Sequence, residues 1–318
     1  MTMPGRVTIA GCGLIGRGWA AAFARAGWPV TLWDRESKVL DPAANAVAAS
    51  LADMAAAGLS LAQGGAGPVT VCDDLGKALI GADYVQENIP EDRAAKAALF
   101  RALDAMAPPS ALIGSSTSTI AGSLFLADLP GRRRCMVAHP ANPPHLMPVV
   151  ELVPSPWHDA ADVAAFRAAL EAVGQVPVVL QREIEGFVMN RLQAAVVNEA
   201  VALVAAGVID PEGLDAVMKH SLGLRWALMG PFETMDLNAP AGFLDYATRY
   251  GENYRAIGTQ LTVGDAWPAA ALDRIEAARR AAVPADAVSR RMRWRDRALM
   301  RLLALRAGMD DQPAGDAP

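Results

Sequence analysis

The sequence has few cysteines and no excess of positive charge, and both absences exclude classes of protein. Only Cys12, Cys72 and Cys135 occur among 318 residues, with no CxxC pair, which fits neither a disulfide framework nor a zinc site. The 29 Lys and Arg residues against 34 Asp and Glu residues give a net charge of −5, so the basic field that nucleic-acid binding uses is missing. We therefore expect no metal site, no nucleic-acid partner and a reducing, cytoplasmic compartment.

The sequence also lacks a long uninterrupted apolar run. The first residues, MTMPGRVTIAG, contain no apolar segment of the kind found in signal peptides. Arg17 and Arg25 interrupt the first apolar stretch, and Asn198 and Glu199 interrupt a later one at 194–206, so we expect no membrane-spanning segment. The chain has instead 53% hydrophobic and 20% charged residues, which is typical of soluble globular proteins.

Strand-like and helix-like segments alternate over the first 180 residues. Val7–Ala10 and Val30–Trp33 are predicted strands, and Leu14–Ala26 between them is a predicted helix. Further strands are predicted at 69–72, 84–86, 111–114, 136–138, 149–153 and 178–180, and further helices at 93–106, 123–129 and 160–173. This alternation predicts an α/β fold with a Rossmann-type, doubly wound and mostly parallel sheet.

From Glu185 onward the pattern changes to helices alone. Ala, Leu and Met recur at helical spacing through 185–207, 210–220, 243–254 and about 268–308. The final residues are polar and contain Pro and Gly, as in many disordered termini. The sequence therefore predicts a Rossmann-type domain over 1–184, an all-helical domain over 185–310 and a disordered tail over 311–318.

A glycine motif lies between the first predicted strand and helix. It consists of Gly11, Cys12, Gly13, Leu14, Ile15 and Gly16. In this position a GxGxxG motif forms a tight turn, lets the backbone approach a pyrophosphate and allows close packing of helix on strand. Asp34 ends the second strand, where a carboxylate binds the ribose hydroxyls of an adenosine and repels a 2′-phosphate. Arg35 could instead hold that phosphate or stack on adenine; the balance favours NAD over NADP.

Several further segments together resemble a known family. SSTS at 115–118, HPANP at 139–143, VVELV around Glu151 and GFVMNR at 186–191 follow in that order. They resemble the 3-hydroxyacyl-CoA dehydrogenase superfamily, and within it the branch of L-gulonate 3-dehydrogenase and lambda-crystallin. The resemblance also includes GLRWALMGPFETMDLNA and covers about residues 7–255.

The resemblance implies an NAD-dependent dehydrogenase with an active site shared among these segments. It assigns catalytic roles to Ser118, His139, Glu151 and Asn190. It assigns cofactor contacts to Glu91, Lys96, Ser115 and Asn142. A histidine, with an ordinary pKa of about 6.5, suits removal of a hydroxyl proton at neutral pH. A carboxylate can orient it, while Ser118 and Asn190 can donate hydrogen bonds to the substrate oxygen.

Two features of the sequence concern the substrate. Between Val39 and Gly76, where CoA-using relatives supply basic residues, the chain has no Lys or Arg, which disfavours CoA thioesters. Arg225 is suited to bind a free carboxylate, unless it is a surface residue that caps a helix. His145 stands where gulonate-type relatives have an aromatic residue, and we expect it at the substrate. We therefore expect a small free hydroxy acid, with L-gulonate implied by the family.

The sequence leaves other interpretations of the function open. L-carnitine, whose trimethylammonium group could face Trp226, and 3-hydroxybutyryl-CoA are alternative substrates. A hydrolase triad of Ser, His and Glu is disfavoured because there is no GxSxG elbow; a non-catalytic, crystallin-like role is a further alternative. We expect a homodimer through the C-terminal helices, and we expect His158, His220 and the run Arg132–Arg134 at the surface.

Overall fold

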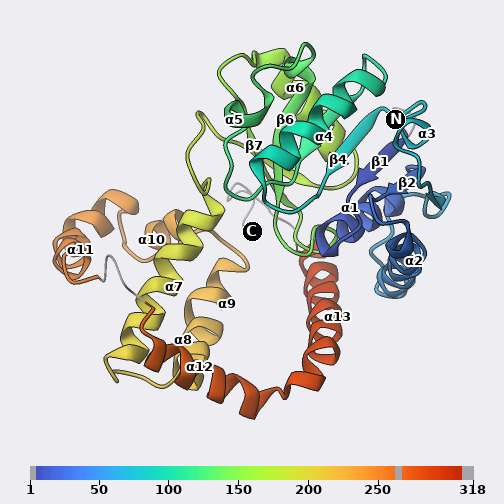
Figure 1. Cartoon of the computed structure of the whole chain (residues 1–318). Helices are drawn as coiled ribbons and strands as arrows, with labels where there is room; N and C mark the ends of the chain where they lie inside the picture. Colours follow the sequence, from blue (N-terminus) through green and yellow to red (C-terminus); the bar gives the residue numbers. More distant parts are fainter. Residues whose placement is uncertain (1–4, 262–266, 310–318) are drawn as a thin grey trace. The chain divides into compact units, whose positions relative to one another are not determined.

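The computed structural model describes residues 5–261 and 267–309, which form two compact units (Figure 1). One unit comprises the described parts of Met1–Asn190 and Asp296–Pro318, and the other comprises Arg191–Arg295. The division after Asn190 lies six residues beyond the boundary that we expected at residue 184. The last helix begins at Val288, and its part from Asp296 onward belongs to the first unit. The tail expected at 311–318 lies outside the described residues.

The first unit is built on one eight-stranded sheet. Its strands are β1 (Val7–Ala10), β2 (Val30–Trp33), β3 (Val69–Val71), β4 (Tyr84–Glu87), β5 (Leu112–Ser115), β6 (Cys135–Pro140), β7 (Val149–Val153) and β8 (Val176–Val179). They lie in the order β3-β2-β1-β4-β5-β6-β7-β8. All neighbouring strands are parallel except β6 and β7, which pair antiparallel. The expected Rossmann-type, mostly parallel sheet is confirmed.

Helices cover this sheet on both faces. They are α1 (Leu14–Arg25), α2 (Leu40–Ala56), α3 (Leu75–Ala78), α4 (Arg93–Met106), α5 (Ser123–Leu126) and α6 (Ala160–Glu171). One buried cluster includes Trp19 of α1 and Phe166 of α6, and a second includes Phe100 of α4. Successive strand residues point to opposite faces, so Ala138 belongs to the first cluster and Val137 to the second. The strands are therefore apolar on both sides, as a buried parallel sheet requires.

Helix α2 is an element that the sequence patterns do not predict. Its 17 residues are rich in alanine, and only Leu40, Ala43, Val47 and Met54 are buried. Alanine occupies both buried and exposed positions of the helix, so the hydrophobic period is weak. A hydrophobic pattern alone therefore misses such a helix.

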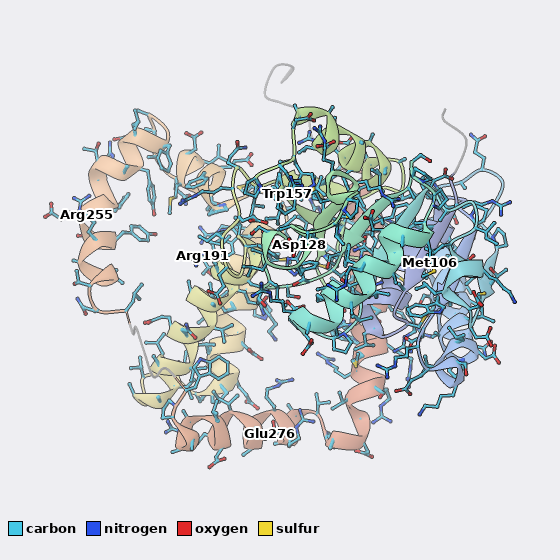
Figure 2. The ribbon with its side chains drawn as sticks, turned by 45° about the horizontal axis from the view of Figure 1, so that its top comes forward. Met106, Asp128, Trp157, Arg191, Arg255 and Glu276 are labelled. Carbon is cyan, nitrogen blue, oxygen red and sulfur yellow. The ribbon has the colours of Figure 1, made fainter. Side chains whose placement is uncertain are left out.

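Helices follow one another from Met189 to the end of the described chain. They are α7 (Met189–Ala205), α8 (Pro211–Val217), the π-helical turn η3 (Met218–Leu222), α9 (Gly223–Trp226), α10 (Pro231–Leu237), α11 (Phe243–Gly258), α12 (Ala269–Ala282) and α13 (Val288–Ala307). After β8 the described residues contain no strand, which confirms the expected helical C-terminal part. No residue of α11 is buried, and Figure 2 shows Arg255 projecting away from this helix.

The end of α13 packs on the first unit. Met300 is buried in the same cluster as Trp19 of α1, and Leu299 and Leu303 pack against that cluster. Arg297 adds an ion pair with Asp53 of α2, at 3.7 Å. The sequence assigned these residues to the helical domain, because helical periodicity does not reveal which surface a helix packs against.

Among the helices of the described residues, none combines the length and the apolar character needed to cross a membrane.

Candidate active site

The glycine motif forms the turn from β1 to α1, and steric contacts within the protein require glycine at Gly11 and Gly16. Gly11 has a left-handed backbone (φ +94°), and a Cβ there would lie 2.9 Å from the backbone of Asn88. A Cβ on Gly16 would lie 1.9 Å from the carbonyl oxygen of Gly11. At Gly13, in contrast, a Cβ would meet nothing within 4 Å. The turn is therefore closely packed at Gly11 and Gly16 and open at Gly13, where a pyrophosphate would approach.

The start of α1 is suited to bind an anion. Gly13 is the N-cap of α1, and no side chain of the described residues caps it. The first N–H groups of a helix have no acceptor within the helix, and the helix dipole favours negative charge there. A phosphate at this point would accept hydrogen bonds from these groups.

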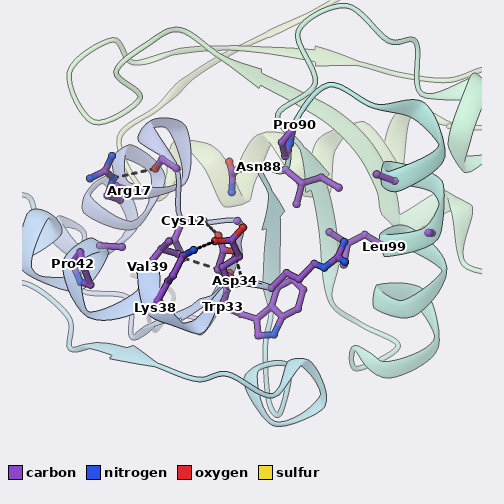
Figure 3. A pocket seen from close by; sticks show the side chains of 18 residues that line it. Cys12, Arg17, Trp33, Asp34, Lys38, Val39, Pro42, Asn88, Pro90 and Leu99 are labelled. Carbon is purple, nitrogen blue, oxygen red and sulfur yellow. Dashed lines mark hydrogen bonds and ion pairs between the residues drawn. The ribbon is translucent and has the colours of Figure 1, made fainter.

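A cavity of about 1530 Å³ opens at the carboxyl ends of β1, β2 and β4 (Figure 3). Five of the predicted cofactor residues line it: Gly11, Cys12, Gly13, Asp34 and Arg35. Leu14, Ile15 and Gly16 belong to the first turn of α1 and are not part of this lining. The lining also includes Arg17 and Asn88, which the sequence interpretation missed. The position of Asn88 directly after β4 is the same signal that pointed to Asp34 after β2.

Asp34 connects the glycine loop to the end of β2. Its Oδ2 accepts a hydrogen bond from the N–H of Cys12 at 2.7 Å, and its Oδ1 accepts one from the N–H of Glu36 at 3.0 Å. A carboxylate oxygen can accept more than one hydrogen bond, so both oxygens remain able to bind ribose hydroxyls. Burial, and secondly the charge of Asp34, raises the pKa of the Cys12 thiol to about 12. Cys12 thus faces the cofactor site as a neutral thiol.

Two predicted cofactor residues, Lys96 and Ser115, belong to a buried cluster around Glu87. Lys96 Nζ lies 2.8 Å from Glu87 Oε1, and the Ser115 hydroxyl donates to Glu87 Oε2 at 2.5 Å. Lys96, Ser115 and Glu87 are all fully buried. Lys96 also lies 3.7 Å from Glu91 Oε2. In this structure these side chains bind one another, and their contact with the cofactor stays a prediction.

Glu91 holds the loop that carries Ser118. Its Oε1 accepts hydrogen bonds from the Thr117 hydroxyl at 2.6 Å and from the N–H groups of Ser118 and Thr119, each at 2.9 Å. Partial burial raises the pKa of Glu91, but these hydrogen bonds and Lys96 together bring that pKa below its ordinary value. Glu91 is therefore an anion that fixes the backbone of the loop after β5.

The register of β6 and β7 brings His139 and Glu151 together. The two residues face each other across the antiparallel pair, and His139 Nδ1 lies 2.8 Å from Glu151 Oε2. They are only 4% and 3% exposed. Glu151 Oε1 accepts two further hydrogen bonds, both at 2.8 Å, from the N–H groups of Val188 and Met189 at the start of α7.

These contacts determine the ionisation of Glu151 and the tautomer of His139. Burial raises the pKa of Glu151, but the hydrogen bonds from His139 and from the two amides more than offset it, and the pKa lies below its ordinary value. An ionised carboxylate accepts the proton of Nδ1, which leaves Nε2 of the neutral imidazole as the basic atom. This is the arrangement of a general base with an orienting carboxylate.

Asn190 and Ser118 lie together beside this pair. Asn190 Nδ2 donates to the carbonyl oxygen of Ser118 at 2.9 Å. Asn190 is in the first turn of α7, whose N-terminus is bound to Glu151. Ser118 follows β5, the neighbour of β6, which carries His139. The structure thus connects all four predicted catalytic residues within the first unit.

The other predicted substrate and cofactor residues lie in other segments of the chain. His145 is buried in the loop between β6 and β7, and its carbonyl oxygen accepts a hydrogen bond from Arg25 Nη1 at 3.2 Å. Asn142 is exposed in the same loop. Arg225 is exposed on α9, in the second unit. Their roles toward the ligands stay predictions.

The expected surface exposure holds for Arg132, Arg133 and His220 and is wrong for His158 and Arg134. His158 is partly buried; its Nδ1 accepts from the N–H of Ser155 at 2.9 Å, and its Nε2 lies 3.1 Å from the carbonyl oxygen of Cys135. In the run Arg132–Arg134, Arg134 is mostly buried and pairs with Asp104 at 2.9 Å. Both residues bind partners distant in sequence, which local composition does not reveal.

A hydrogen-bond network around Ser116 was also missed. The Ser116 hydroxyl accepts from Trp19 Nε1 at 3.0 Å and from Gln86 Nε2 at 2.7 Å, and it donates to Asn88 Oδ1 at 2.7 Å. Gln86 Nε2 also lies 3.2 Å from the carbonyl oxygen of Ala138. The network therefore joins a residue of the cofactor cavity to the strand that carries His139. The polar run Gln-Glu-Asn at the end of the apolar strand β4 was its signal in the sequence.

A loop suited to a pyrophosphate and a histidine suited to accept a proton lie at the same edge of one doubly wound sheet. This combination defines the class of protein as a dehydrogenase that uses a nicotinamide dinucleotide. The chain belongs to the 3-hydroxyacyl-CoA dehydrogenase family: the profile of the NAD binding domain matches residues 6–184, and that of the C-terminal domain matches residues 186–265. The expected family, dehydrogenase activity and NAD cofactor are thereby confirmed.

Several known proteins are similar over nearly the whole chain. A lambda-crystallin homolog from Bos taurus is 41% identical over 309 residues, 95% of this chain and 96% of that protein. An L-carnitine dehydrogenase/betainyl-CoA thioesterase from Rhizobium meliloti is 34% identical over 314 residues, 97% of this chain and 62% of that protein. The crystal structure of 5-formyl-3-hydroxy-2-methylpyridine 4-carboxylic acid 5-dehydrogenase, an NAD+ dependent dismutase, has a TM-score of 0.84 at 28% identity and covers 97% of this chain and 100% of that one. Similarity therefore extends beyond residue 255, where the shared motifs end.

Proposed function

We propose that this protein oxidises the 3-hydroxyl group of a small free hydroxy acid, and that the acid is L-gulonate, which becomes 3-dehydro-L-gulonate. The observation that carries the proposal is the 2.8 Å contact of His139 Nδ1 with Glu151. Because Nδ1 donates to a carboxylate, Nε2 of His139 is available to take the hydroxyl proton. When bound, NAD accepts the hydride from the carbon that carries this hydroxyl.

Glu151 and its two amide donors support the base without taking the proton themselves. As Nε2 becomes protonated, the imidazolium faces a carboxylate that already carries a full negative charge. Asn190 uses one amide hydrogen for the Ser118 carbonyl oxygen and keeps a second for the substrate oxygen. The Ser118 hydroxyl is the other donor that we assign to this oxygen.

Two parts of the cavity would bind two parts of the cofactor. The N–H groups at Gly13 and the start of α1 would hold the pyrophosphate, and Asp34 would bind the adenosine ribose. Cys12 and Arg35 line the same cavity. The backbone of Cys12 is fixed by Asp34.

A free acid is favoured over a CoA thioester by the absence of basic residues from 39–76. This range includes the whole of α2 and the loop after it, so these two segments offer no cation for the phosphates of CoA. Arg225 supplies the cation that we assign to a free carboxylate. The choice of L-gulonate rests on the resemblance to the L-gulonate 3-dehydrogenase and lambda-crystallin branch.

L-carnitine is the second candidate, since an L-carnitine dehydrogenase/betainyl-CoA thioesterase is 34% identical to this chain. Trp226 is 40% exposed on α9, next to Arg225, and an exposed indole can bind a trimethylammonium group. 3-Hydroxybutyryl-CoA is the third candidate, and a non-catalytic, crystallin-like role is the remaining one.

We also propose a cytoplasmic homodimer formed through the C-terminal helices. Large apolar side chains are exposed in the second unit: Leu224, Leu228, Phe232, Leu237, Leu244 and Ile257. Exposed apolar side chains gathered within one part of a chain are typical of interaction surfaces. Sedimentation velocity should give twice the monomer mass; a monomer at micromolar concentration would refute the dimer.

An NAD-coupled assay tests the substrate. L-gulonate, other polyol acids, L-carnitine and 3-hydroxybutyryl-CoA are compared through the absorbance of the reduced nicotinamide. We expect the highest kcat/KM for L-gulonate; a preference for the CoA thioester would refute the free-acid proposal. NAD binding with no turnover on any substrate would favour the non-catalytic role.

Two variants test the assigned residues. His139→Gln should abolish turnover and leave the Kd for NAD unchanged; retained turnover would refute the base. Arg225→Ala should raise KM for the carboxylate substrate at least tenfold, whereas Arg167→Ala, at an exposed site on α6, should not. An unchanged KM in Arg225→Ala would refute the carboxylate contact.

A further inference from the structure

Phe187 has an unusual backbone conformation for a bulky residue. Among the described residues it is the only non-glycine residue with a positive φ, at 48°. This left-handed conformation is unfavourable for residues that carry a Cβ, and it is rare for large side chains. Phe187 is also fully buried. Such outliers persist only where the surrounding structure holds them, and they cluster at functional sites.

The conformation of Phe187 directs two amides toward Glu151. Gly186 and Phe187 are consecutive residues with positive φ, at 71° and 48°. The next two N–H groups, those of Val188 and Met189, both donate to Glu151 Oε1 at 2.8 Å. An extended or right-handed residue at position 187 would turn these N–H groups elsewhere. The left-handed turn is therefore what allows the start of α7 to bind the carboxylate.

The side chain of Phe187 contacts the other member of the pair. Its ring centroid lies 5.5 Å from that of His139, with an angle of 54° between the planes. The ring belongs to the same buried cluster as Val137, Leu180 and Phe125. It is thus anchored in the core on one side and packs against the imidazole on the other.

We propose that Phe187 is a positioning residue for the His139–Glu151 pair. Its backbone aims two amides at Glu151, and its ring limits the rotation of His139, so that Nε2 is held toward the substrate. The burial of the ring offsets the cost of the backbone conformation. The inference rests on the proposed function, because it takes His139 as the base.

Simple filling of the core is the competing explanation. Glycine would adopt this backbone conformation at no steric cost, as Gly186 does in the adjacent position. A side chain that only filled space would not need to lie against the imidazole or to share a turn with the donors to Glu151. Both features act on the same pair, so a substitution should change catalysis beyond its effect on stability.

The test compares Phe187→Leu with Phe100→Leu. Phe100 is fully buried in the same cluster and does not line the cofactor cavity. Phe100→Leu therefore removes the same side-chain volume from the core as Phe187→Leu does. With the best substrate of the panel, kcat should fall at least tenfold in Phe187→Leu and stay within twofold in Phe100→Leu. The Kd for NAD should stay within twofold in both. If Phe187→Leu does not fold, Phe187→Met replaces it, since methionine fills a similar volume without a flat ring.

A double variant separates positioning from general destabilisation. If Phe187 acts through the pair, Phe187→Leu should lower kcat little further in a Glu151→Gln background. Independent effects would multiply instead. Multiplying losses, or a kcat of Phe187→Leu within twofold of wild type, would overturn the inference.

A second readout does not depend on the substrate. The chain has four histidines, so the His139 ring proton can be assigned by NMR with single variants. His139 Nδ1 lies 2.8 Å from Glu151 Oε2, and the resonance of the proton in this hydrogen bond should shift in Phe187→Leu and not in Phe100→Leu. An unchanged resonance in Phe187→Leu would overturn the inference. The proposed function fails separately, if His139→Gln keeps its turnover.

Discussion

Glu151→Gln is the substitution for which the structure predicts the largest effect with the smallest change in shape. Glutamine has the size of glutamate but carries no charge, and its amide group can donate to Nδ1 of His139. Such a hydrogen bond would favour the tautomer that places the proton on Nε2, where the base must be free. The variant therefore loses both the orientation of the base and the charge that stabilises its protonated form.

The magnitude of this loss follows from the 2.8 Å contact between His139 Nδ1 and Glu151 Oε2. Charge centres about 4 Å apart attract by about 4 kcal/mol at an effective dielectric constant of about 20. Each 1.4 kcal/mol, roughly, corresponds to a factor of ten in rate, so kcat should fall by about a thousandfold. The residues assigned to the pyrophosphate and the adenosine ribose belong to the separate cavity around Gly13 and Asp34, so the Kd for NAD should not change.

The assay measures kcat at saturating substrate and the Kd for NAD by tryptophan fluorescence. Glu171→Gln is the matched control, because Glu171 is exposed at the end of α6 and should keep wild-type kcat. If Glu151→Gln retained more than a tenth of the wild-type kcat, the assignment of Glu151 as the partner of the base would be wrong.

The same pair also makes stability depend on pH. The pKa of Glu151 in the folded state lies below the ordinary value of 4.5, so the folded state favours the ionised carboxylate. Its contribution to stability is fully present above pH 4.5 and is lost as the pH falls through the lowered folded value. In urea titrations, the stability difference between wild type and Glu151→Gln should therefore be larger at pH 7 than at pH 3. A difference independent of pH would contradict the ionised state.

Three further predictions concern the cofactor site and its support. Asp34→Ala should weaken NAD binding at least tenfold, because it removes the ribose acceptor and the partner of the Cys12 amide; an unchanged Kd by fluorescence titration would contradict this. Lys96→Met should lower the free energy of unfolding by about 3–5 kcal/mol, because it leaves the Glu87 carboxylate buried without its cation; a loss below about 1 kcal/mol in urea titrations would argue against the pair. A thiol reagent at pH 8 should label Cys72 before Cys12, whose pKa is raised to about 12, and equal rates by mass spectrometry would refute this order.

Local patterns were sufficient for much of the fold. The strand at Val7–Ala10 and the helix Arg93–Met106 agree with the structure at both ends, because hydrophobic period and flanking turn residues act over short distances. Helix α2 was missed, since alanine gives a weak period. The return of α13 to the first unit was missed because it depends on a packing partner more than two hundred residues away.

The candidate site divides in the same way. The motifs named His139, Glu151, Ser118 and Asn190, but the contacts among them come from the sheet register and from the start of α7. Lys96 illustrates the limit of motif transfer: its position was found, while its pairing with Glu87 depends on burial, which spacing does not describe. Phe187 was inside a recognised motif without an assigned role, because a positive φ is visible only in the folded backbone.

The sequence by itself determined the chemistry that this protein can perform. The glycine turn, Asp34 and the histidine belong to short segments, and their resemblance to a known family already indicated a nicotinamide-dependent dehydrogenase. Only the tertiary structure decided how these groups act on one another. It determines which nitrogen of His139 can accept a proton, why Glu151 stays ionised, and that Phe187 packs against the imidazole. Proton transfer depends on distances of a few ångströms between segments far apart in the chain, and only folding brings such segments together.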